Sequence, residues 1–242
     1  MHPVLTVFLY GSITAVATGL GALPFAFVRG LSDRFVAYAN AIAAGLMLGA
    51  SFGLLTEGTR YGNWQTVVGA NLGILFILGT ERFLAGREVD FGEVQGASAR
   101  RMALIVIVMT VHSVAEGVAV GTAFGGGASL GLVITVAIAV HNVPEGLAIS
   151  AVLRPRGTSL AACAGWSVFS SLPQPLMAVP AFIFVEAFRT VLPYGLGFAA
   201  GAMVYMVLVE LLPEAFHQGR RAAVATLASV AAIGMVLFQA WL

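Results

Sequence analysis

The feature that most constrains this chain is a series of apolar runs, each about as long as a membrane is thick. A bilayer core about 30 Å thick requires about 20 helical residues to cross it. The runs do not alternate apolar and polar residues as β-barrel strands do. They predict an all-α integral membrane protein with eight transmembrane helices. Their ranges are 4–28, 35–57, 66–84, 102–124, 130–152, 159–185, 191–214 and 222–242.

Composition leaves no room for a soluble domain beside these runs. Charged residues make up 10% of the chain and hydrophobic residues 59%, whereas soluble domains carry about 25% charged residues. Residues 1–242 are therefore expected to form a single polytopic transmembrane domain, with 85–101 as a polar cytoplasmic loop. The net charge of +1 comes without a basic stripe, which argues against a nucleic-acid partner. The single cysteine, Cys163, excludes a disulfide framework or a thiolate cluster within the chain.

Arginine placement predicts the orientation of the helices. With eight spans, ten of the 12 basic residues fall in loops on one side, and only Arg60 and Arg189 fall on the other. The positive-inside rule assigns the ten to the cytoplasm and both termini to the outside. A bacterial inner membrane is the expected location. The ten are Arg29, Arg34, Arg82, Arg87, Arg100, Arg101, Arg154, Arg156, Arg220 and Arg221.

The fourth and fifth runs contain an internal repeat. Residues 111–121 read VHSVAEGVAVG and residues 140–150 read VHNVPEGLAIS, with six identical positions. A weaker similarity links the second run, from Ala43, with the seventh, from Ala199. Internal repeats of this kind are common in transporters, whose substrate site lies at the repeat interface.

The repeat supplies two His–Glu pairs near the middle of the predicted membrane. His112 and Glu116, like His141 and Glu145, are four residues apart, so both members of a pair project from one helix face. The short glycine-rich turn at Gly125–Gly127 predicts that the two helices pack as antiparallel neighbours. The four side chains are therefore expected to meet as a cluster of two imidazoles and two carboxylates.

This cluster favours a bound divalent cation. A charged side chain at the bilayer centre costs at least about 2.5–3.5 kcal/mol, even on insertion scales, and two facing carboxylates also repel each other. A divalent cation neutralises both and takes the imidazole nitrogens as ligands. Imidazole with carboxylate suits zinc first, with iron, manganese and cadmium as alternatives. The simpler interpretation is a pair of His–Glu hydrogen bonds that only join two helices.

The two motifs resemble the signature of the ZIP (Zrt/Irt-like) family of divalent-metal transporters. HNVPEG begins at His141 and is preceded by HSVAEG at His112. The resemblance implies eight helices in a three-plus-two-plus-three inverted-repeat bundle with both termini outside. It also implies that His112, Glu116, His141 and Glu145 form the main transport site. Ser113 and Asn142 would then face a second metal site that shares the glutamates.

The sixth run departs from the family pattern. The family often supplies a further carboxylate to the second site from this helix, but here Ser171 or Gln174 occupies that depth. A single-ion site is therefore expected. Pro173 and Pro175 are expected either to free the carbonyls of Phe169 and Ser171 or only to bend the helix.

Other residues are weaker candidates. Pro144 predicts either a broken helix beside the cluster or a tolerated kink. A last group could act along the metal pathway, but its members are equally well explained by core packing or as solvated helix ends. This group contains Met47, Ser51, Glu57, Met203, Glu210, Glu214 and His217.

Three functions fit these features. The first is a carrier of divalent metal into the cytoplasm, with the metal as substrate, no resident cofactor and no catalytic residue. The second is an intramembrane metal-dependent enzyme, although neither the H-E-x-x-H motif nor the E-x-x-H motif is present. The third is a membrane protein that binds metal without moving it. A homodimer is compatible with each of them.

Overall fold

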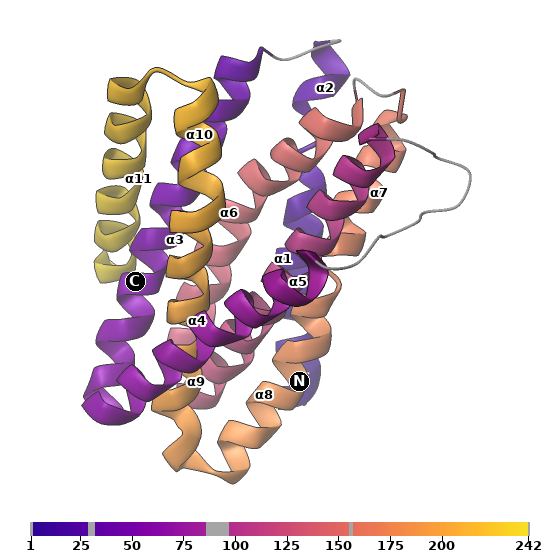
Figure 1. Ribbon diagram of the computed structural model, residues 1–242. Helices are drawn as coiled ribbons and strands as arrows, with labels where there is room; N and C mark the ends of the chain where they lie inside the picture. The colour runs from indigo at the N-terminus through magenta and orange to yellow at the C-terminus, as the bar shows by residue number, and fades with distance from the viewer. Residues whose placement is uncertain (1, 29–31, 86–96, 155–156, 242) are drawn as a thin grey trace.

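Helices follow all of the predicted apolar runs in the structure, a computed structural model that describes residues 2–28, 32–85, 97–154 and 157–241 (Figure 1). No strand occurs among these residues. Two short segments, η2 (Arg189–Val191) and the π-helix η3 (Val207–Leu211), flank α9. The α-helices are α1 (Pro3–Leu20), α2 (Pro24–Phe27), α3 (Asp33–Tyr61), α4 (Asn63–Ala85), α5 (Ala97–Gly126), α6 (Ala128–Leu153), α7 (Leu160–Ser170), α8 (Pro173–Ala187), α9 (Leu192–Met206), α10 (Leu212–Gln218) and α11 (Arg221–Trp241).

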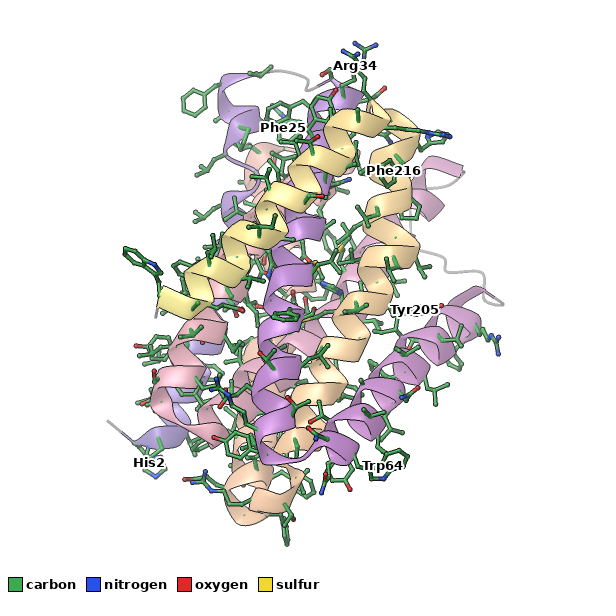
Figure 2. The ribbon with its side chains drawn as sticks, turned by 90° about the vertical axis from the view of Figure 1, so that its left-hand side faces the viewer. His2, Phe25, Arg34, Trp64, Tyr205 and Phe216 are labelled. Carbon is green, nitrogen blue, oxygen red and sulfur yellow. The ribbon has the colours of Figure 1, made fainter. Side chains whose placement is uncertain are left out.

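Six helical segments of the described chain are long and apolar enough to cross a membrane. Helices α4 and α5, which contain 23 and 30 residues, follow the remaining two predicted runs. Figure 2 shows His2 and Trp64 at one end of the bundle and Arg34 and Phe216 at the opposite end. The six segments are Pro3–Phe27, Asp33–Tyr61, Ala128–Leu153, Leu160–Ala187, Arg189–Gln218 and Arg221–Trp241.

Local sequence explains where several helices begin. The side-chain oxygen of Ser32 accepts a hydrogen bond from the Phe35 amide at the start of α3, and Ser159 caps α7 in the same way, as N-cap residues commonly do. Gly127 alone separates α5 from α6, with φ at 151° and ψ at 155°. Only glycine adopts this backbone conformation readily, so the tight connection depends on it.

Two sequence predictions need correction, and the structure decides between the two alternatives for Pro144. Helix α5 begins at Ala97, inside the predicted loop 85–101, and residues 86–96 of that loop lie outside the described residues. The first run is interrupted by a turn at residues 21–23, before Pro24 starts α2. Pro144 does not break its helix, because α6 continues from Ala128 to Leu153 around it.

The sixth run is interrupted in its middle, between α7 and α8. A turn at Ser171 and Leu172 ends one helix, and Pro173 starts the next. The carbonyls of Phe169 and Ser171 are not freed by the prolines, because they accept hydrogen bonds from the amides of Leu172 and Gln174 at 3.1 and 3.0 Å. The interruption therefore satisfies its own backbone while it places Gln174 in the first turn of α8.

Glycines bring α4 and α9 into direct backbone contact. Gly69 and Gly73 on α4 lie against the carbonyls of Tyr194 and Phe198. Gly197 and Gly201 on α9 lie equally close to backbone atoms of α4. An added Cβ atom at any of these glycines would come closer than 3.0 Å to the facing carbonyl oxygen. Small residues spaced by four allow this close packing of membrane helices.

The close contacts divide the helices into two groups. In the described chain, glycines approach the backbone of another helix only within a first bundle (α1, α5, α6, α7 and α8) or within a second bundle (α3, α4, α9, α10 and α11). Between the bundles, Gly195 meets the side chain of Thr122 and Gly126 meets that of Leu192. Helix α3 packs on α6 and α5 packs on α9 across this boundary. Each bundle is therefore more tightly joined internally than to the other.

Candidate metal site

The two His–Glu pairs lie on neighbouring helices of the first bundle. His112 and Glu116 come from α5, and His141 and Glu145 come from α6. All four are buried, with at most 2% of each residue exposed. The one-residue connection at Gly127 and the contact between α5 and α6 hold the pairs face to face. The predicted meeting of the two motifs therefore occurs inside the bundle.

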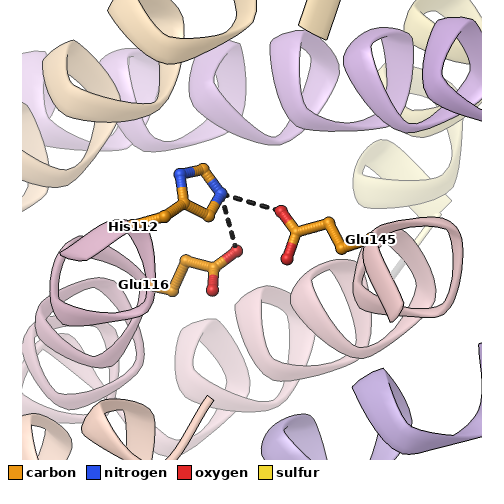
Figure 3. A group of neighbouring side chains, drawn as sticks. All are labelled: His112, Glu116 and Glu145. Atoms are coloured by element: carbon orange, nitrogen blue, oxygen red, sulfur yellow. Dashed lines mark ion pairs between the residues drawn. The ribbon is translucent and has the colours of Figure 1, made fainter. Parts of the chain in front are cut away.

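Three of these side chains converge on one point (Figure 3). The Nε2 atom of His112 lies 2.8 Å from Oε1 of Glu145 and 3.3 Å from Oε1 of Glu116. One ligand atom from each of His112, Glu116 and Glu145 lies within 4.8 Å of the others. Imidazole nitrogen and carboxylate oxygen at this spacing suit a first-row transition-metal ion. Their role as ligands remains a prediction.

Two atoms at the point of convergence have no hydrogen-bond partner among the described residues. They are Nε2 of His112 and Oε1 of Glu145, which face each other without the alignment that a hydrogen bond requires. Buried polar atoms are nearly always paired, and leaving one unpaired costs about 1–3 kcal/mol. A shared cation would satisfy both atoms. The simpler interpretation of helix-joining His–Glu contacts accounts for the hydrogen bond between His141 and Glu116, but not for the missing hydrogen bonds at these two atoms.

His141 joins the cluster through Glu116. Its Nε2 atom lies 2.7 Å from Oε1 of Glu116, and its Nδ1 atom has no hydrogen-bond partner among the described residues. The same oxygen of Glu116 thus faces both histidines. His141 lies outside the tight group of three, so its contact with a bound ion would require a small movement of its ring.

Two amide side chains occupy the other side of Glu116. Nε2 of Gln174, from α8, donates a hydrogen bond to Oε2 of Glu116 at 2.5 Å. Nδ2 of Asn142 donates to Oε1 of Gln174 at 3.1 Å and to the carbonyl of Thr14 at 2.8 Å. The sequence places Ser171 or Gln174 at this depth, where either could offer only a neutral oxygen to a metal ion. The nitrogen of Gln174 faces the cluster instead.

Met206 is a contact of the cluster that the sequence did not reveal. Its sulfur touches Nδ1 of His112, on the ring edge opposite the two carboxylates. Met206 is 1% exposed and ends α9, so it approaches from the second bundle. The weaker predictions Met47 and Met203 lie instead in the hydrophobic core. The sequence shows only that Met206 follows Met203 by three residues. This spacing does not tell which of the two methionines reaches the cluster.

The remaining predicted residues lie further from the cluster or on its edge. Ser113 is buried on α5 next to His112. Ser51 donates a hydrogen bond to the Met47 carbonyl of its own helix at 2.8 Å. Glu57 forms an ion pair of 2.9 Å with Arg60. Glu214, near the end that carries Arg34, accepts a hydrogen bond from Gln218, and His217 is exposed there.

Comparison with known proteins gives a consistent result. The family model described as "ZIP Zinc transporter" matches residues 86–238. An Arabidopsis thaliana protein named for zinc transport is 46% identical over 95% of this chain. The zinc transporter GufA of Myxococcus xanthus is 31% identical over 86% of this chain and 87% of its own length. The zinc transporter ZIPB of Bordetella bronchiseptica is 33% identical over 95% of this chain and 79% of its own length.

The coverage of the relatives is uneven. This chain spans 38% of the length of the Arabidopsis relative and of human ZIP11, but most of the two bacterial relatives. The family match includes both His–Glu motifs and the helices around them. The matched family model, the long apolar helices and the similarity along nearly the whole chain agree that this multi-pass membrane protein belongs to the ZIP zinc transporter family.

Proposed function

We propose that the chain carries a divalent transition-metal ion into the cytoplasm through the cluster of His112, Glu116, His141 and Glu145. The observation that carries this proposal is the convergence of Nε2 of His112 and Oε1 of Glu145, two buried atoms that have no hydrogen-bond partner among the described residues. A cation relieves their desolvation and the repulsion between the two carboxylates. An ion held only by a few side chains can also leave, as transport requires.

Zinc is the proposed substrate, with iron, manganese and cadmium as alternatives. The donor set of imidazole and carboxylate is compatible with all four ions and disfavours magnesium and calcium, which prefer oxygen ligands alone. Three relatives that cover nearly the whole chain are named zinc transporters. The negative interior of a cell favours inward movement by about 2.3 kcal/mol per charge for each 100 mV.

We infer that all eight long helical segments cross the membrane and that both termini lie outside. Helices α4 and α5 are about 35 and 45 Å long at 1.5 Å per residue, which exceeds the thickness of the bilayer core. His2 lies at the end of the bundle opposite Arg34, as the arginine distribution requires. Contacts also recur in matched pairs, since α4 on α9 corresponds to α11 on α3, and α1 on α6 corresponds to α8 on α5. These pairs support the three-plus-two-plus-three inverted repeat.

Alternating access is proposed to occur by movement of the first bundle against the second. The four proposed ligands all belong to the first bundle, and His112 among them contacts Met206 of the second. Backbone contacts at glycines join each bundle internally, while the two glycines at the boundary meet only side chains. Side-chain contacts rearrange at lower cost than interlocked backbones. The boundary is therefore the natural place for sliding or rocking.

Uptake of labelled metal by proteoliposomes tests the proposal. Wild-type protein should take up ⁶⁵Zn, and Glu116→Ala and Glu145→Ala should each reduce the flux at least tenfold, because each removes a charged ligand. Glu186→Ala is the matched control, since Glu186 is an exposed acid on α8. Retained flux in both site variants would contradict the site.

The same assay separates the two alternative functions. A metal-dependent enzyme or a non-transporting metal-binding protein would bind zinc at the cluster but give no flux above empty liposomes. Competition by iron, manganese and cadmium in the uptake assay would then rank the substrates of a working carrier.

A further inference from the structure

We infer that Gln174 is a positioning residue that restricts Glu116 to one ligating oxygen, so that the site holds a single divalent ion per chain. The inference rests on the proposed function and deepens it, because it specifies how many ions the site carries. It follows from a chain of hydrogen bonds that starts at a backbone carbonyl and ends at Glu116.

The chain of hydrogen bonds fixes which end of each amide points where. The carbonyl oxygen of Thr14 can only accept, so the Asn142 atom beside it, at 2.8 Å, is the nitrogen Nδ2. The same nitrogen lies 3.1 Å from Gln174, whose facing atom must therefore be the oxygen Oε1. The nitrogen Nε2 of Gln174 is then the end that faces Glu116. The carboxylate accepts its hydrogen bond at Oε2.

In this arrangement, the two oxygens of the Glu116 carboxylate have different partners. Oε1 lies 2.7 Å from Nε2 of His141 and 3.3 Å from Nε2 of His112, so it faces the side where Glu145 also points. Oε2 receives the N–H of Gln174, which takes up one of its lone pairs and holds that oxygen toward the amide. Oε1 is therefore the oxygen of Glu116 that is directed at a bound ion.

The side of Glu116 that faces Gln174 lacks the charge to hold a second ion. The groups that the hydrogen bonds place there are the amides of Gln174 and Asn142 and the carbonyl of Thr14, all of which are neutral. Oδ1 of Asn142 is buried without a hydrogen-bond partner, but a neutral oxygen alone does not offset the desolvation of a divalent ion. Gln174 is 0% exposed, so bulk solvent does not screen an ion on this side. The neutral amides therefore take the place of a second ion.

Metal stoichiometry of the purified full-length protein tests this inference. Elemental analysis after equilibration with zinc and removal of free metal should give one zinc per wild-type chain. Gln174→Glu should bind two, because the new carboxylate removes the donor to Oε2 and adds a negative ligand beside it. Gln65→Glu makes the same chemical change at a partly exposed glutamine at the start of α4, and it should still bind one.

A second variant reports on positioning rather than charge. Gln174→Leu removes the hydrogen bond to Oε2 without adding a ligand. It should keep the stoichiometry at one while weakening zinc affinity about tenfold, as is typical when a residue that orients a ligand is lost. Unchanged affinity in a folded Gln174→Leu protein would contradict the positioning role.

The failures of the inference and of the proposed function have different signatures. Two zinc ions per wild-type chain, both lost in Glu116→Ala, would overturn the single-ion inference and leave the proposed transport function standing. This measurement does not depend on whether a Gln174 variant folds. A folded Gln174→Glu protein that still binds one ion would also overturn it. Wild-type zinc binding and flux that are insensitive to Glu116→Ala and Glu145→Ala would instead refute the proposed transport site.

Discussion

At the scale of single residues, the site is a group of buried polar atoms that the protein alone does not satisfy. Nε2 of His112 and Oε1 of Glu145 lie 2.8 Å apart as an ion pair, and neither atom has a hydrogen-bond partner among the described residues. Such atoms destabilise the ion-free fold, so an ion that pairs them binds the native state in preference to the unfolded chain. Metal should therefore raise stability in proportion to its binding.

The first prediction concerns this linkage. In detergent, saturating zinc should raise the melting temperature of the wild-type protein, because zinc binds the folded state at the cluster. Glu145→Ala should abolish the zinc-dependent rise, whereas the exposed-acid variant Glu186→Ala should retain it. Differential scanning fluorimetry with and without zinc makes the comparison. An equal zinc-dependent rise in Glu145→Ala would place the binding site elsewhere.

The second prediction concerns the sulfur behind His112. Met206→Leu removes the contact with the ring edge while it nearly preserves volume, and sulfur–aromatic contacts contribute about 0.3–1.5 kcal/mol. The apparent affinity for zinc in the uptake assay should therefore fall about two- to tenfold, with protein yield unchanged. Met203→Leu, at an equally buried methionine of the same helix, is the control and should leave the affinity unchanged. Equal effects of the two variants would make Met206 an ordinary packing residue.

Sequence spacing was sufficient to predict the meeting of the two His–Glu pairs but not the neighbours that orient them. The pairs are local patterns, since a spacing of four fixes the face of a helix and the glycine turn fixes the partner. The donor role of Gln174 depends on the interruption at Ser171 and Leu172 and on a carbonyl of α1 that is distant in sequence. No local pattern encodes such a tertiary arrangement.

At the scale of elements, some glycines bring two helices into close contact, whereas other glycines of the same helix meet no neighbour. On α4, Gly73 lies against the carbonyl of Phe198, whereas Gly79 of the same helix has nothing within 4 Å. The apolar runs predicted both helices, but they did not distinguish these glycines, because hydropathy does not encode which face of a lipid-crossing helix meets protein. The partner helix decides it.

The third prediction uses this matched pair. Gly79→Ala should stabilise the protein by up to about 1 kcal/mol, because alanine is the better helix former and the added methyl group meets no neighbour. Gly73→Ala should destabilise it by about 1–3 kcal/mol, because the methyl group forces α4 and α9 apart. Thermal unfolding in detergent compares the two. A Gly73→Ala protein as stable as Gly79→Ala would contradict the interlocked packing.

At the scale of the whole molecule, we expect the two ends of the bundle to lie on opposite sides of the membrane. Trp64 lies at the end that carries His2, and Phe216 lies at the end that carries Arg34 (Figure 2). Arginine placement alone predicts which end faces the cytoplasm, because loops without bulky domains follow the positive-inside rule, and this orientation stays a prediction. The division into two bundles was not predictable in the same way, since it depends on which glycines meet a backbone.

The fourth prediction tests which end of the bundle faces the cytoplasm, and the single native cysteine provides the unlabelled background. Cys163 is buried, so the wild-type protein should remain unlabelled by a membrane-impermeant maleimide. Asn63→Cys, beside Trp64, should be labelled on intact cells. His217→Cys, beside Phe216, should be labelled only after the membrane is permeabilised. The reverse pattern would invert the proposed topology.

The single-residue connection at Gly127 has a consequence for biosynthesis. Gly127 alone joins α5 to α6, so under the proposed topology we expect the two helices to enter the lipid together as one hairpin. Glu116 then reaches the hydrocarbon already beside His141 rather than alone, which avoids an insertion penalty of about 2.5–3.5 kcal/mol for an isolated acid. Under the proposed topology, this hairpin would bring the two His–Glu motifs together as it enters the membrane.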